Sequence, residues 1–429
     1  METNQNSLKR HLSLFSVSVF GIGVIVGAGI YSVIGVAYGY AQDTIWLSFL
    51  LAGLAAFLTG VSYCEVVTMY PSAGAEYVYL RKAFPKTALP SFLTAMVLIT
   101  GGAVTAAAVA VSFAGYLQYF FQFNRSFAAA SLIVISTVIN LRGIQSSNRA
   151  NLLFTFLEIA GIFLVLWFGF TEKNPVTSAS LKIHGGTLTA VGLIFFVYLG
   201  FEDIANLSEE TISPEKNIPK AILYSLALTT GLYLLISFSV MRLIDSETLA
   251  SSSFPLADVL KNKSATASRI LSVIALFSTG NTALITLLVT SRMLFSVARS
   301  GELPSIFAKT IGKNLIPVPA TLLTMGMTLL FLFFDKLEML VSLSSLATLI
   351  AFASVNFSVI RLRFIEEETK RAFRVPMNFG KWPLPSIAGF LLTLFMCFDF
   401  NKQVYTIFTA VLFFCGIMFF FRKKTSANL

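Results

Sequence analysis

Three carboxylates stand inside long apolar stretches of this sequence. Glu158 lies in NLLFTFLEIAGIFLVLWFGF, and Glu202 and Asp203 directly follow Gly200 in FFVYLGFEDIANLSEE. An acidic residue at the centre of a bilayer costs about 2.5 kcal/mol or more, so a function is its default interpretation. We expect Glu158 to carry a proton or to bind a cation, and the other two to gate or to contact a cation. The structural alternatives are a hydrogen bond of Glu158 and a span that ends near Gly200.

A run of five glycines, GIGVIVGAGIYSVIG at 21–35, raises a second question. The spacing does not fit the dinucleotide fingerprint GxGxxG. Gly23 and Gly27 could allow close helix packing, because they form a small-xxx-small pair. Alternatively, Gly27, Ala28 and Gly29 could interrupt the helix and present bare backbone N–H and C=O groups to a cavity. These two groups would suit the two charges of a zwitterion.

Interrupted helices of transporters come in pairs related by symmetry, so a second break is expected in the other half of the chain. Gly200 provides it. The eighth apolar run adds hydroxyl groups, since Ser278 and Thr282 are four residues apart and share one helical face. With Glu158 and the carbonyl of Gly23, they are our candidates for a coupling site.

The amino-acid composition indicates the class of protein in which these polar groups stand. Of the 429 residues, 56% are hydrophobic and only 12% are charged, whereas a soluble chain has about 25% charged residues. Two histidines and three unpaired cysteines predict no metal site, no cofactor, no disulfide and no enzyme. The net charge of +10 is best explained by basic loops of a membrane protein and not by nucleic-acid binding.

Apolar runs of about 20 residues, long enough to cross a bilayer, predict an all-α polytopic membrane protein in a single domain. Most Lys and Arg residues fall in loops on one side when the N-terminus is placed inside, which predicts a cell-membrane protein with both termini cytoplasmic. The twelve predicted spans are 14–37, 45–69, 91–119, 127–141, 151–170, 188–208, 220–241, 267–297, 319–334, 338–360, 386–399 and 404–421.

Four blocks of sequence resemble the amino acid–polyamine–organocation permeases. They are GVIVGAGIYSVIG (23–35), YCEVVTMYPSAGAEYVYLRKAF (63–84), FFVYLGFEDIANLSEETISPEKNIPKAI (195–222) and SRMLFSVARSGELPSIFAK (291–309). The resemblance implies a LeuT-like five-plus-five inverted repeat with broken helices 1 and 6. The repeats would span 12–170 and 188–360, and 386–421 would hold two additional helices.

The resemblance also implies a substrate site. The substrate carboxylate would meet the N–H groups of Gly27, Ala28 and Gly29, and an aromatic residue matching Phe201 would cover the substrate. In one respect the chain departs from the family pattern, because Glu158 stands where several proton-coupled members carry a lysine. The substrate ammonium would meet carbonyls that match Ile25, Phe196, Val197 and Leu199.

The resulting hypothesis is a secondary active transporter of amino acids that works by alternating access and is coupled to protons, with sodium as the other candidate ion. Its partners would be a small amino acid or amine, the coupling ion and the lipid bilayer. An amine or polyamine carrier, an amino acid antiporter, and a non-transporting amino acid sensor remain the alternatives.

Overall fold

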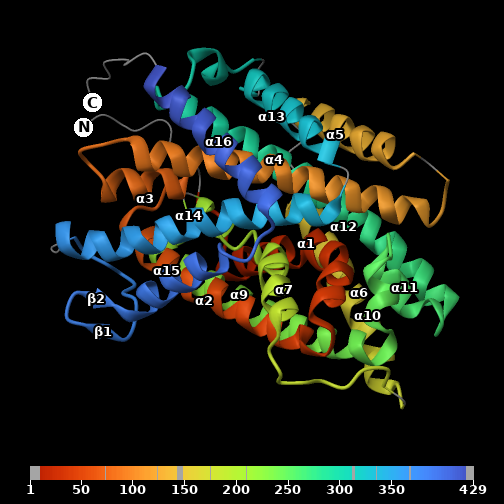
Figure 1. Cartoon of the computed structure of the whole chain (residues 1–429). Coiled ribbons are helices and arrows are strands. Elements are labelled where there is room, and N and C mark those ends of the chain that lie inside the picture. Colours follow the sequence, from red (N-terminus) through yellow and green to blue (C-terminus); the bar gives the residue numbers. More distant parts are fainter. Residues whose placement is uncertain are drawn as a thin grey trace.

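The computed structural model describes residues 10–72, 74–122, 124–142, 148–173, 175–208, 210–311, 315–334, 336–366 and 369–421, and this part of the chain is almost entirely helical (Figure 1). The long helices are α1 (Leu14–Ala41), α2 (Ile45–Met69), α4 (Leu89–Gln118), α5 (Arg125–Leu141), α6 (Asn148–Thr171), α9 (Pro214–Leu243), α12 (Ala265–Arg299), α14 (Leu337–Ile365) and α16 (Lys402–Phe421).

Shorter elements connect these helices. The short helices are α3 (Ala75–Ala83), α7 (Gly185–Phe195), α8 (Asp203–Asn206), α10 (Ser246–Ala250), α11 (Pro255–Lys261), α13 (Val318–Phe331) and α15 (Leu384–Met396). The 3-10 turns are η1 (Gln42–Thr44), η2 (Phe196–Tyr198), η3 (Ser305–Ala308) and η4 (Leu332–Phe334). Two short antiparallel strands, β1 (Asn378–Phe379) and β2 (Trp382–Pro383), form a hairpin.

Among the described residues, 8 helical stretches are long and apolar enough to cross a membrane. The first of them, Leu14–Met69, contains both α1 and α2, and three shorter apolar helices cover Arg125–Leu141, Val318–Phe334 and Leu384–Met396. Each predicted span coincides with one of these helices to within a few residues. The chain is therefore a polytopic helical membrane protein, while the count of twelve spans stays a prediction.

Two of the apolar helices are interrupted near their middle. Inside α1, the backbone of Gly27 leaves helical geometry, with φ −4° and ψ −146°. In the second case α7 ends in the turn η2, and the chain then becomes extended at Leu199 (ψ 145°) before Gly200 takes a φ of 109°. Glycine adopts that positive φ at little cost because it has no Cβ. Both interruptions fall at glycines where the sequence predicted them.

The interrupted helices lie in the interior of the bundle. Helix α1 contacts α6, α7, α9 and α12, and its central residues from Ile25 to Gly35 are all buried. Around it, α4 packs along α12 and α14, and α2 packs along α9 (Figure 1). Apolar side chains on nearly every face explain why these helices are buried and give no amphipathic pattern.

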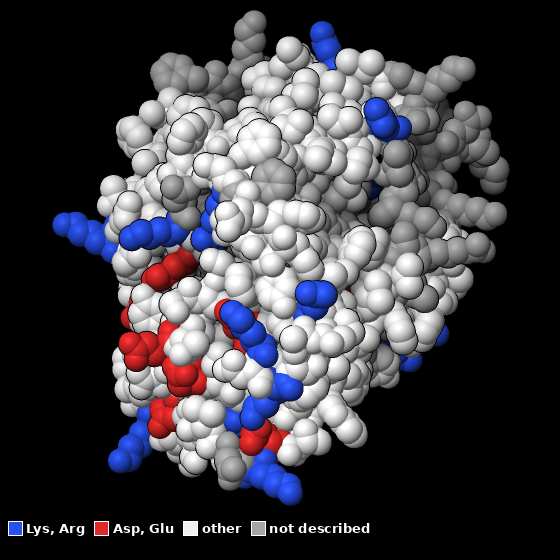
Figure 2. All heavy atoms as spheres, turned by 90° about the vertical axis from the view of Figure 1, so that its right-hand side faces the viewer, with Lys and Arg blue, Asp and Glu red and all other residues white. Residues whose placement is uncertain are grey.

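The helices α10 and α11 form a cap at one end of the bundle, between the predicted spans 220–241 and 267–297. Asp245 begins α10, because its carboxylate accepts hydrogen bonds from the N–H (2.8 Å) and the hydroxyl (2.8 Å) of Thr248. Both hydrogen bonds lower the pKa of Asp245, and the bond from the backbone N–H has the larger effect. Figure 2 views this end of the molecule and shows acidic and basic side chains intermixed over part of it.

A buried cluster of charges holds the loop between α14 and α15 in place. The carboxylate of Glu65 in α2 accepts two hydrogen bonds from Arg363 in α14, at 2.6 and 2.5 Å. It also accepts a bond from Arg371 at 3.1 Å and one from the N–H of Val375 at 2.8 Å. Glu65 is only 1% exposed, so this one side chain holds the loop against two helices.

Candidate functional site

The two interrupted helices touch each other at their breaks. A Cβ on Gly29 would lie 2.9 Å from the Cα of Val197, and a Cβ on Gly200 would lie 2.4 Å from a side-chain carbon of Val24. Contacts this short are possible only because both positions lack a side chain. The glycines that the sequence singled out therefore allow two stretches of irregular backbone to lie side by side.

A tyrosine from α9 lies between the two breaks. The hydroxyl of Tyr233 is 2.7 Å from the carbonyl oxygen of Ile25 and 3.1 Å from that of Val197. Since one hydroxyl reaches both, the two carbonyl oxygens point into the same small volume. Sequence analysis missed Tyr233. The hydroxyl group of a buried tyrosine usually has a hydrogen-bond partner, but the sequence does not identify that partner.

Ala28 is held by α12 in this structure. Its N–H donates a hydrogen bond to the hydroxyl of Thr282 at 3.1 Å, and its carbonyl accepts one from Ser32 at 2.7 Å. A Cβ on Gly27 would lie 2.9 Å from the same Thr282 oxygen. Thr282, which we had grouped with the coupling residues, thus reaches the break in α1 itself, next to the predicted carboxylate site.

Glu158 lies on α6, facing the first half of α1 and α12. It is 2% exposed, and its Oε1 has no hydrogen-bond partner among the described residues. The hydroxyls of Thr155 and Ser278 share that condition, and Ser278 lies beside the carboxylate. A Cβ on Gly23 would lie 2.0 Å from the Thr155 hydroxyl. The fold therefore brings together Glu158, Ser278 and Gly23 of the predicted coupling group and adds Thr155 to them.

Tyr31 connects this coupling group to the break. Its hydroxyl donates to the backbone oxygen of Glu158 at 2.8 Å, and its own carbonyl accepts a hydrogen bond from Tyr116 at 2.9 Å. Tyr31 lies in α1, a few residues after Gly29, and is fully buried. A movement of the first helix would therefore be felt at the backbone of Glu158.

Glu202, two residues after Gly200, has a local role in this structure. Glu202 accepts a hydrogen bond from the N–H of Gly200 at 2.8 Å, which satisfies a backbone donor freed by the break. Asp203 is the first residue of α8, and Asn206 is its last. The carboxamide oxygen of Asn206 caps α3, because it accepts hydrogen bonds from the N–H groups of Gly74 (3.0 Å) and Ala75 (3.2 Å). The second break is thereby tied to α3, a helix that sequence analysis did not predict.

The remaining predicted substrate residues lie at the second break. Phe196 and Val197 are buried in η2, and Leu199 provides the extended residue. Phe201 is fully buried in an aromatic cluster, with ring centroids 5.6 Å from Tyr63 and 5.0 Å from Phe352. Its role as a cover for a substrate stays a prediction.

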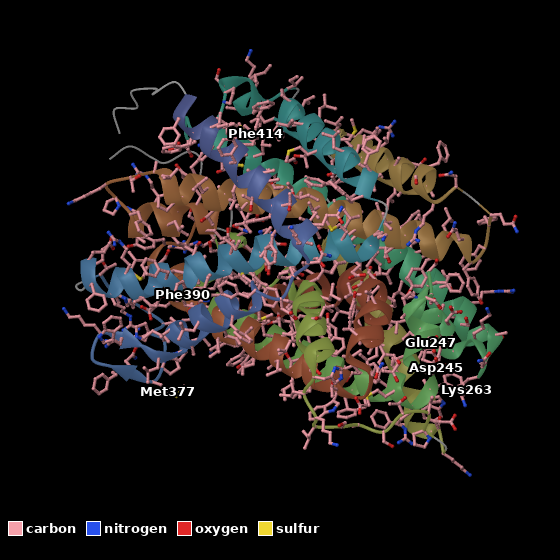
Figure 3. The ribbon with its side chains drawn as sticks, viewed as in Figure 1. Asp245, Glu247, Lys263, Met377, Phe390 and Phe414 are labelled. Atoms are coloured by element: carbon pink, nitrogen blue, oxygen red, sulfur yellow. The ribbon has the colours of Figure 1, made fainter. Side chains whose placement is uncertain are left out.

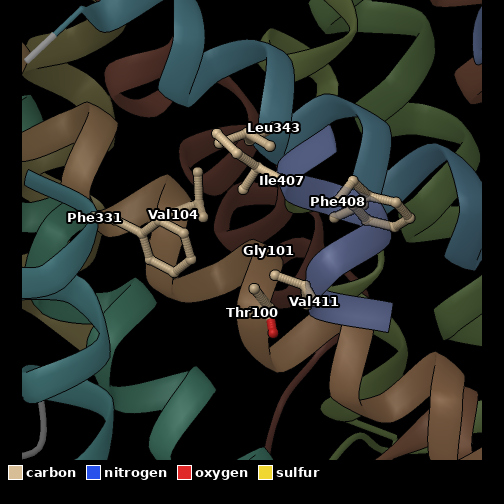
Figure 4. Close-up of a pocket in the computed structure, with 9 residues that line it drawn as sticks. Thr100, Gly101, Val104, Phe331, Leu343, Ile407, Phe408 and Val411 are labelled. Carbon is tan, nitrogen blue, oxygen red and sulfur yellow. The ribbon is translucent and has the colours of Figure 1, made fainter. Parts of the chain in front are cut away.

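A pocket that is visible in the structure lies elsewhere. Nine residues from α4, α13, α14 and α16 surround it, and Thr100, Val104, Phe331 and Phe408 are among them (Figure 4). Its lining is almost wholly apolar and includes none of the predicted site residues. Among the described residues, no group of three or more His, Cys, Asp or Glu side chains could hold a metal ion.

Comparison with known proteins agrees with this architecture. The model of the amino acid permease family matches residues 12–425. The methylthioribose transporter of Bacillus subtilis is 31% identical over 87% of this chain and 86% of its own length. The branched-chain amino acid permease BcaP of the same organism is 26% identical over 100% and 96%. The human cationic amino acid transporter 4 is 27% identical over 84% and 61%. These relatives are transporters and not enzymes, and the chain belongs to the amino acid permease family.

Proposed function

We propose that this protein is a secondary active transporter that moves amino acids across the cell membrane by alternating access and is driven by protons. The observation that carries the proposal is the convergence of the Ile25 and Val197 carbonyl oxygens on one hydroxyl group. Two carbonyls from two broken helices form a fitting receptor for the ammonium group of an amino acid, because each can accept one of its N–H donors.

The substrate carboxylate is assigned to the break in α1. Gly27, Ala28 and Gly29 begin the second half of that helix, whose N-terminal N–H groups favour an anion. Thr282 accepts from the Ala28 N–H at 3.1 Å, so substrate binding would exchange this neutral acceptor for a charged one. Charge-assisted hydrogen bonds are about twice as strong as neutral ones, which favours the exchange.

Glu158 is assigned to energy coupling. Glu158 is 2% exposed, and a charge in an apolar interior is costly, so the binding of a proton or a cation would change the energy of this group. The link from Tyr31 to the Glu158 backbone at 2.8 Å would connect this event to α1. Ser278, Thr155 and Gly23 complete the coupling group.

The proposed topology has twelve spans, with both termini cytoplasmic. The first repeat comprises residues 12–170, the second comprises 188–360, and 386–421 adds two helices. The pair of breaks near Gly27 and Gly200 supports the repeat, because the two interruptions fall in the first helix of each half. The loop charges counted in the sequence support the orientation.

The main competing function is a carrier or exchanger of cationic amino acids or amines. Several relatives are named cationic amino acid transporters, and Glu202 and Asp203 lie next to the second break. Glu202 is engaged by the Gly200 N–H at 2.8 Å, so it is a weaker candidate for a ligand than the carbonyls.

Uptake into liposomes tests the proposal. Purified protein would be reconstituted and offered labelled branched-chain amino acids, cationic amino acids, putrescine and methylthioribose, under a proton gradient, a sodium gradient or neither. We expect an amino acid to accumulate with the proton gradient alone. Uptake that requires preloaded substrate would indicate an exchanger, and preferred uptake of putrescine an amine carrier. Binding without uptake or exchange of any compound would contradict a transport function and favour a sensor.

A further inference from the structure

The cap of α10 and α11 is seated on the second half of α1 through two glycines. A Cβ on Gly35 would lie 2.7 Å from the carbonyl oxygen of Leu249, and a Cβ on Gly39 would lie 2.6 Å from the Cβ of Ala250. The two glycines are four residues apart, so they lie on one face of the helix. Because the cap touches the helix backbone at both positions, a displacement of this half of α1 would be transmitted to the cap.

The cap also reaches the end of α4. Figure 3 shows Asp245 and Glu247 of α10 together with Lys263, which follows the end of α11, at the edge of the molecule. On the inner side of the cap, a Cβ on Gly115 of α4 would collide with the carbonyl oxygen of Ser253. The cap therefore extends from α1 to α4 across one end of the bundle.

Tyr116 in α4 joins the cap to α1. Its hydroxyl donates a hydrogen bond to the carbonyl oxygen of Tyr31 at 2.9 Å and accepts one from the N–H of Leu256 in α11 at 3.4 Å. The N–H groups of the first turn of a helix have no partner within that helix, so Tyr116 satisfies a donor that the start of α11 leaves free. A single, fully buried hydroxyl thus connects three elements.

Tyr31 continues this chain of hydrogen bonds to α6. Its hydroxyl donates to the backbone oxygen of Glu158 at 2.8 Å. A Cβ on Gly161 would lie 2.6 Å from the same hydroxyl, so a glycine on α6 provides the room that the phenol needs. Three hydrogen bonds in series, through Tyr116 and Tyr31, therefore connect the N–H of Leu256 in the cap to the backbone of Glu158.

Two carboxyl groups face this chain of bonds, Glu158 at one end and Asp258 of α11 at the other. Asp258 has partners inside the cap, since it accepts a hydrogen bond from the hydroxyl of Ser252 at 2.6 Å and lies 3.9 Å from the Nζ of Lys261. Glu158 faces the hydroxyl of Tyr233, and its Oε1 has no hydrogen-bond partner in the described part of the chain. Because an uncompensated buried charge is costly, a change of charge at Glu158 would favour a movement of the groups around it.

We propose that Tyr116 is a positioning residue that couples the seating of the cap to the state of Glu158. When Glu158 gains or loses a proton or a cation, its turn of α6 shifts, and the two tyrosines carry the shift to α1 and to the start of α11. The seated cap in turn holds Tyr31 against α6. This inference rests on the coupling role proposed above for Glu158, and it extends that role to the far end of the bundle.

A double-mutant cycle tests the link without requiring transport. Protein in nanodiscs would carry the reporter Leu249→Cys, at a position that is fully buried where the cap meets α1, and its labelling by a soluble maleimide would report opening of the cap. Labelling of the protein without the reporter would be subtracted. We expect Glu158→Gln to slow labelling at least about two-fold between neutral and alkaline pH, because a neutral amide removes the charge that disfavours the closed arrangement. In Tyr116→Phe the same substitution should have no effect.

Tyr119→Phe is the matched control. Tyr119 also lies at the end of α4, where its hydroxyl is 3.2 Å from that of Ser268 and its ring packs edge-on against Phe254 at the start of α11, at 5.3 Å between centroids. Its loss should loosen the cap and speed labelling, yet the effect of Glu158→Gln should persist. Gly161→Ala, which displaces the Tyr31 hydroxyl from α6, should abolish that effect as Tyr116→Phe does.

The cycle separates a positioning role from a structural one. An equal effect of Glu158→Gln in the parent and in Tyr116→Phe, or no effect in either, would overturn the proposal and leave Tyr116 a structural contact of the cap. Uptake into liposomes by the same variants tests the proposed function independently. A parent that transports nothing but shows the expected cycle would contradict transport and retain the link between the cap and Glu158.

Discussion

Gly29 and Val197 lie so close that a Cβ on Gly29 would stand 2.9 Å from the Cα of Val197. The near atom belongs to the backbone of the second break, so it cannot rotate away as the end of a side chain could. The contact places the backbone of one interrupted helix directly against the other. It also explains why a glycine stands at a position where helix propensity alone would favour alanine.

Gly29→Ala should therefore destabilise the protein, because the added methyl group would force the two breaks apart. Overpacking of this kind costs about 1–3 kcal/mol. Thermal unfolding in detergent would measure the loss, and substrate binding should weaken in the same variant. The control is Gly231→Ala in α9, where a Cβ meets nothing within 4 Å. A Gly29→Ala variant as stable and as active as the parent would show that the breaks separate easily.

Tyr233→Phe should destabilise the substrate-free protein, because it leaves the carbonyls of Ile25 and Val197 without their donor. A buried polar group that loses its partner costs about 1–3 kcal/mol. If an ammonium group binds these carbonyls, it replaces the missing donor, so substrate should raise the melting temperature of the variant more than that of the parent. A thermal-shift titration with the transported amino acid measures both effects.

The matched control is Tyr224→Phe, on the same helix but 57% exposed, which should change neither quantity. An equal substrate-induced shift in Tyr233→Phe and the parent would place the ammonium group elsewhere. The two carbonyls would then be structural acceptors only.

The breaks could be predicted from the sequence and their partners could not. Gly27 and Gly200 carry a local signal, since glycine in an apolar helix indicates a position where helical geometry can end. Thr282 and Tyr233 contact Ala28 and Ile25 at the first break, although 254 and 208 residues separate the two members of each pair in sequence. Hydroxyl residues are common on buried helices, so only packing decides which of them meets a free backbone group.

The same limit applies to the polar loops. Residues 361–385 lie between the predicted spans 338–360 and 386–399, and the structure builds a hairpin there whose base is bonded to Glu65, about three hundred residues earlier. Buried charges are paired because an isolated charge costs too much in an apolar interior. The buried Glu65 in α2 therefore requires a cationic partner, but nothing in the sequence near it distinguishes Arg363 from the other arginines.

Glu65→Gln should be strongly destabilising, since Arg363 would remain buried without its carboxylate. Removal of one partner of a buried ion pair costs about 3–5 kcal/mol. Loss of helical signal on heating would report it, and protease cleavage between α14 and α15 should become faster because the loop loses its anchor. Glu247→Gln, at an exposed position in α10, is the control. Unchanged stability with unchanged cleavage would mean that Arg371 and the loop backbone hold this region without Glu65.

Glu158→Gln should uncouple uptake from the proton gradient. Glutamine resembles the protonated acid in size and polarity but has no proton to release, so the coupling group would stay in one state at every pH. Substrate binding should persist, because the proposed ammonium and carboxylate contacts belong to other residues, and exchange of internal for external substrate should continue. Glu158→Asp keeps an exchangeable proton and should retain part of the response. Uptake that follows the proton gradient unchanged in Glu158→Gln would make Glu158 a structural residue. If Glu158→Gln instead abolished the dependence of uptake on a sodium gradient, the coupling ion would be sodium.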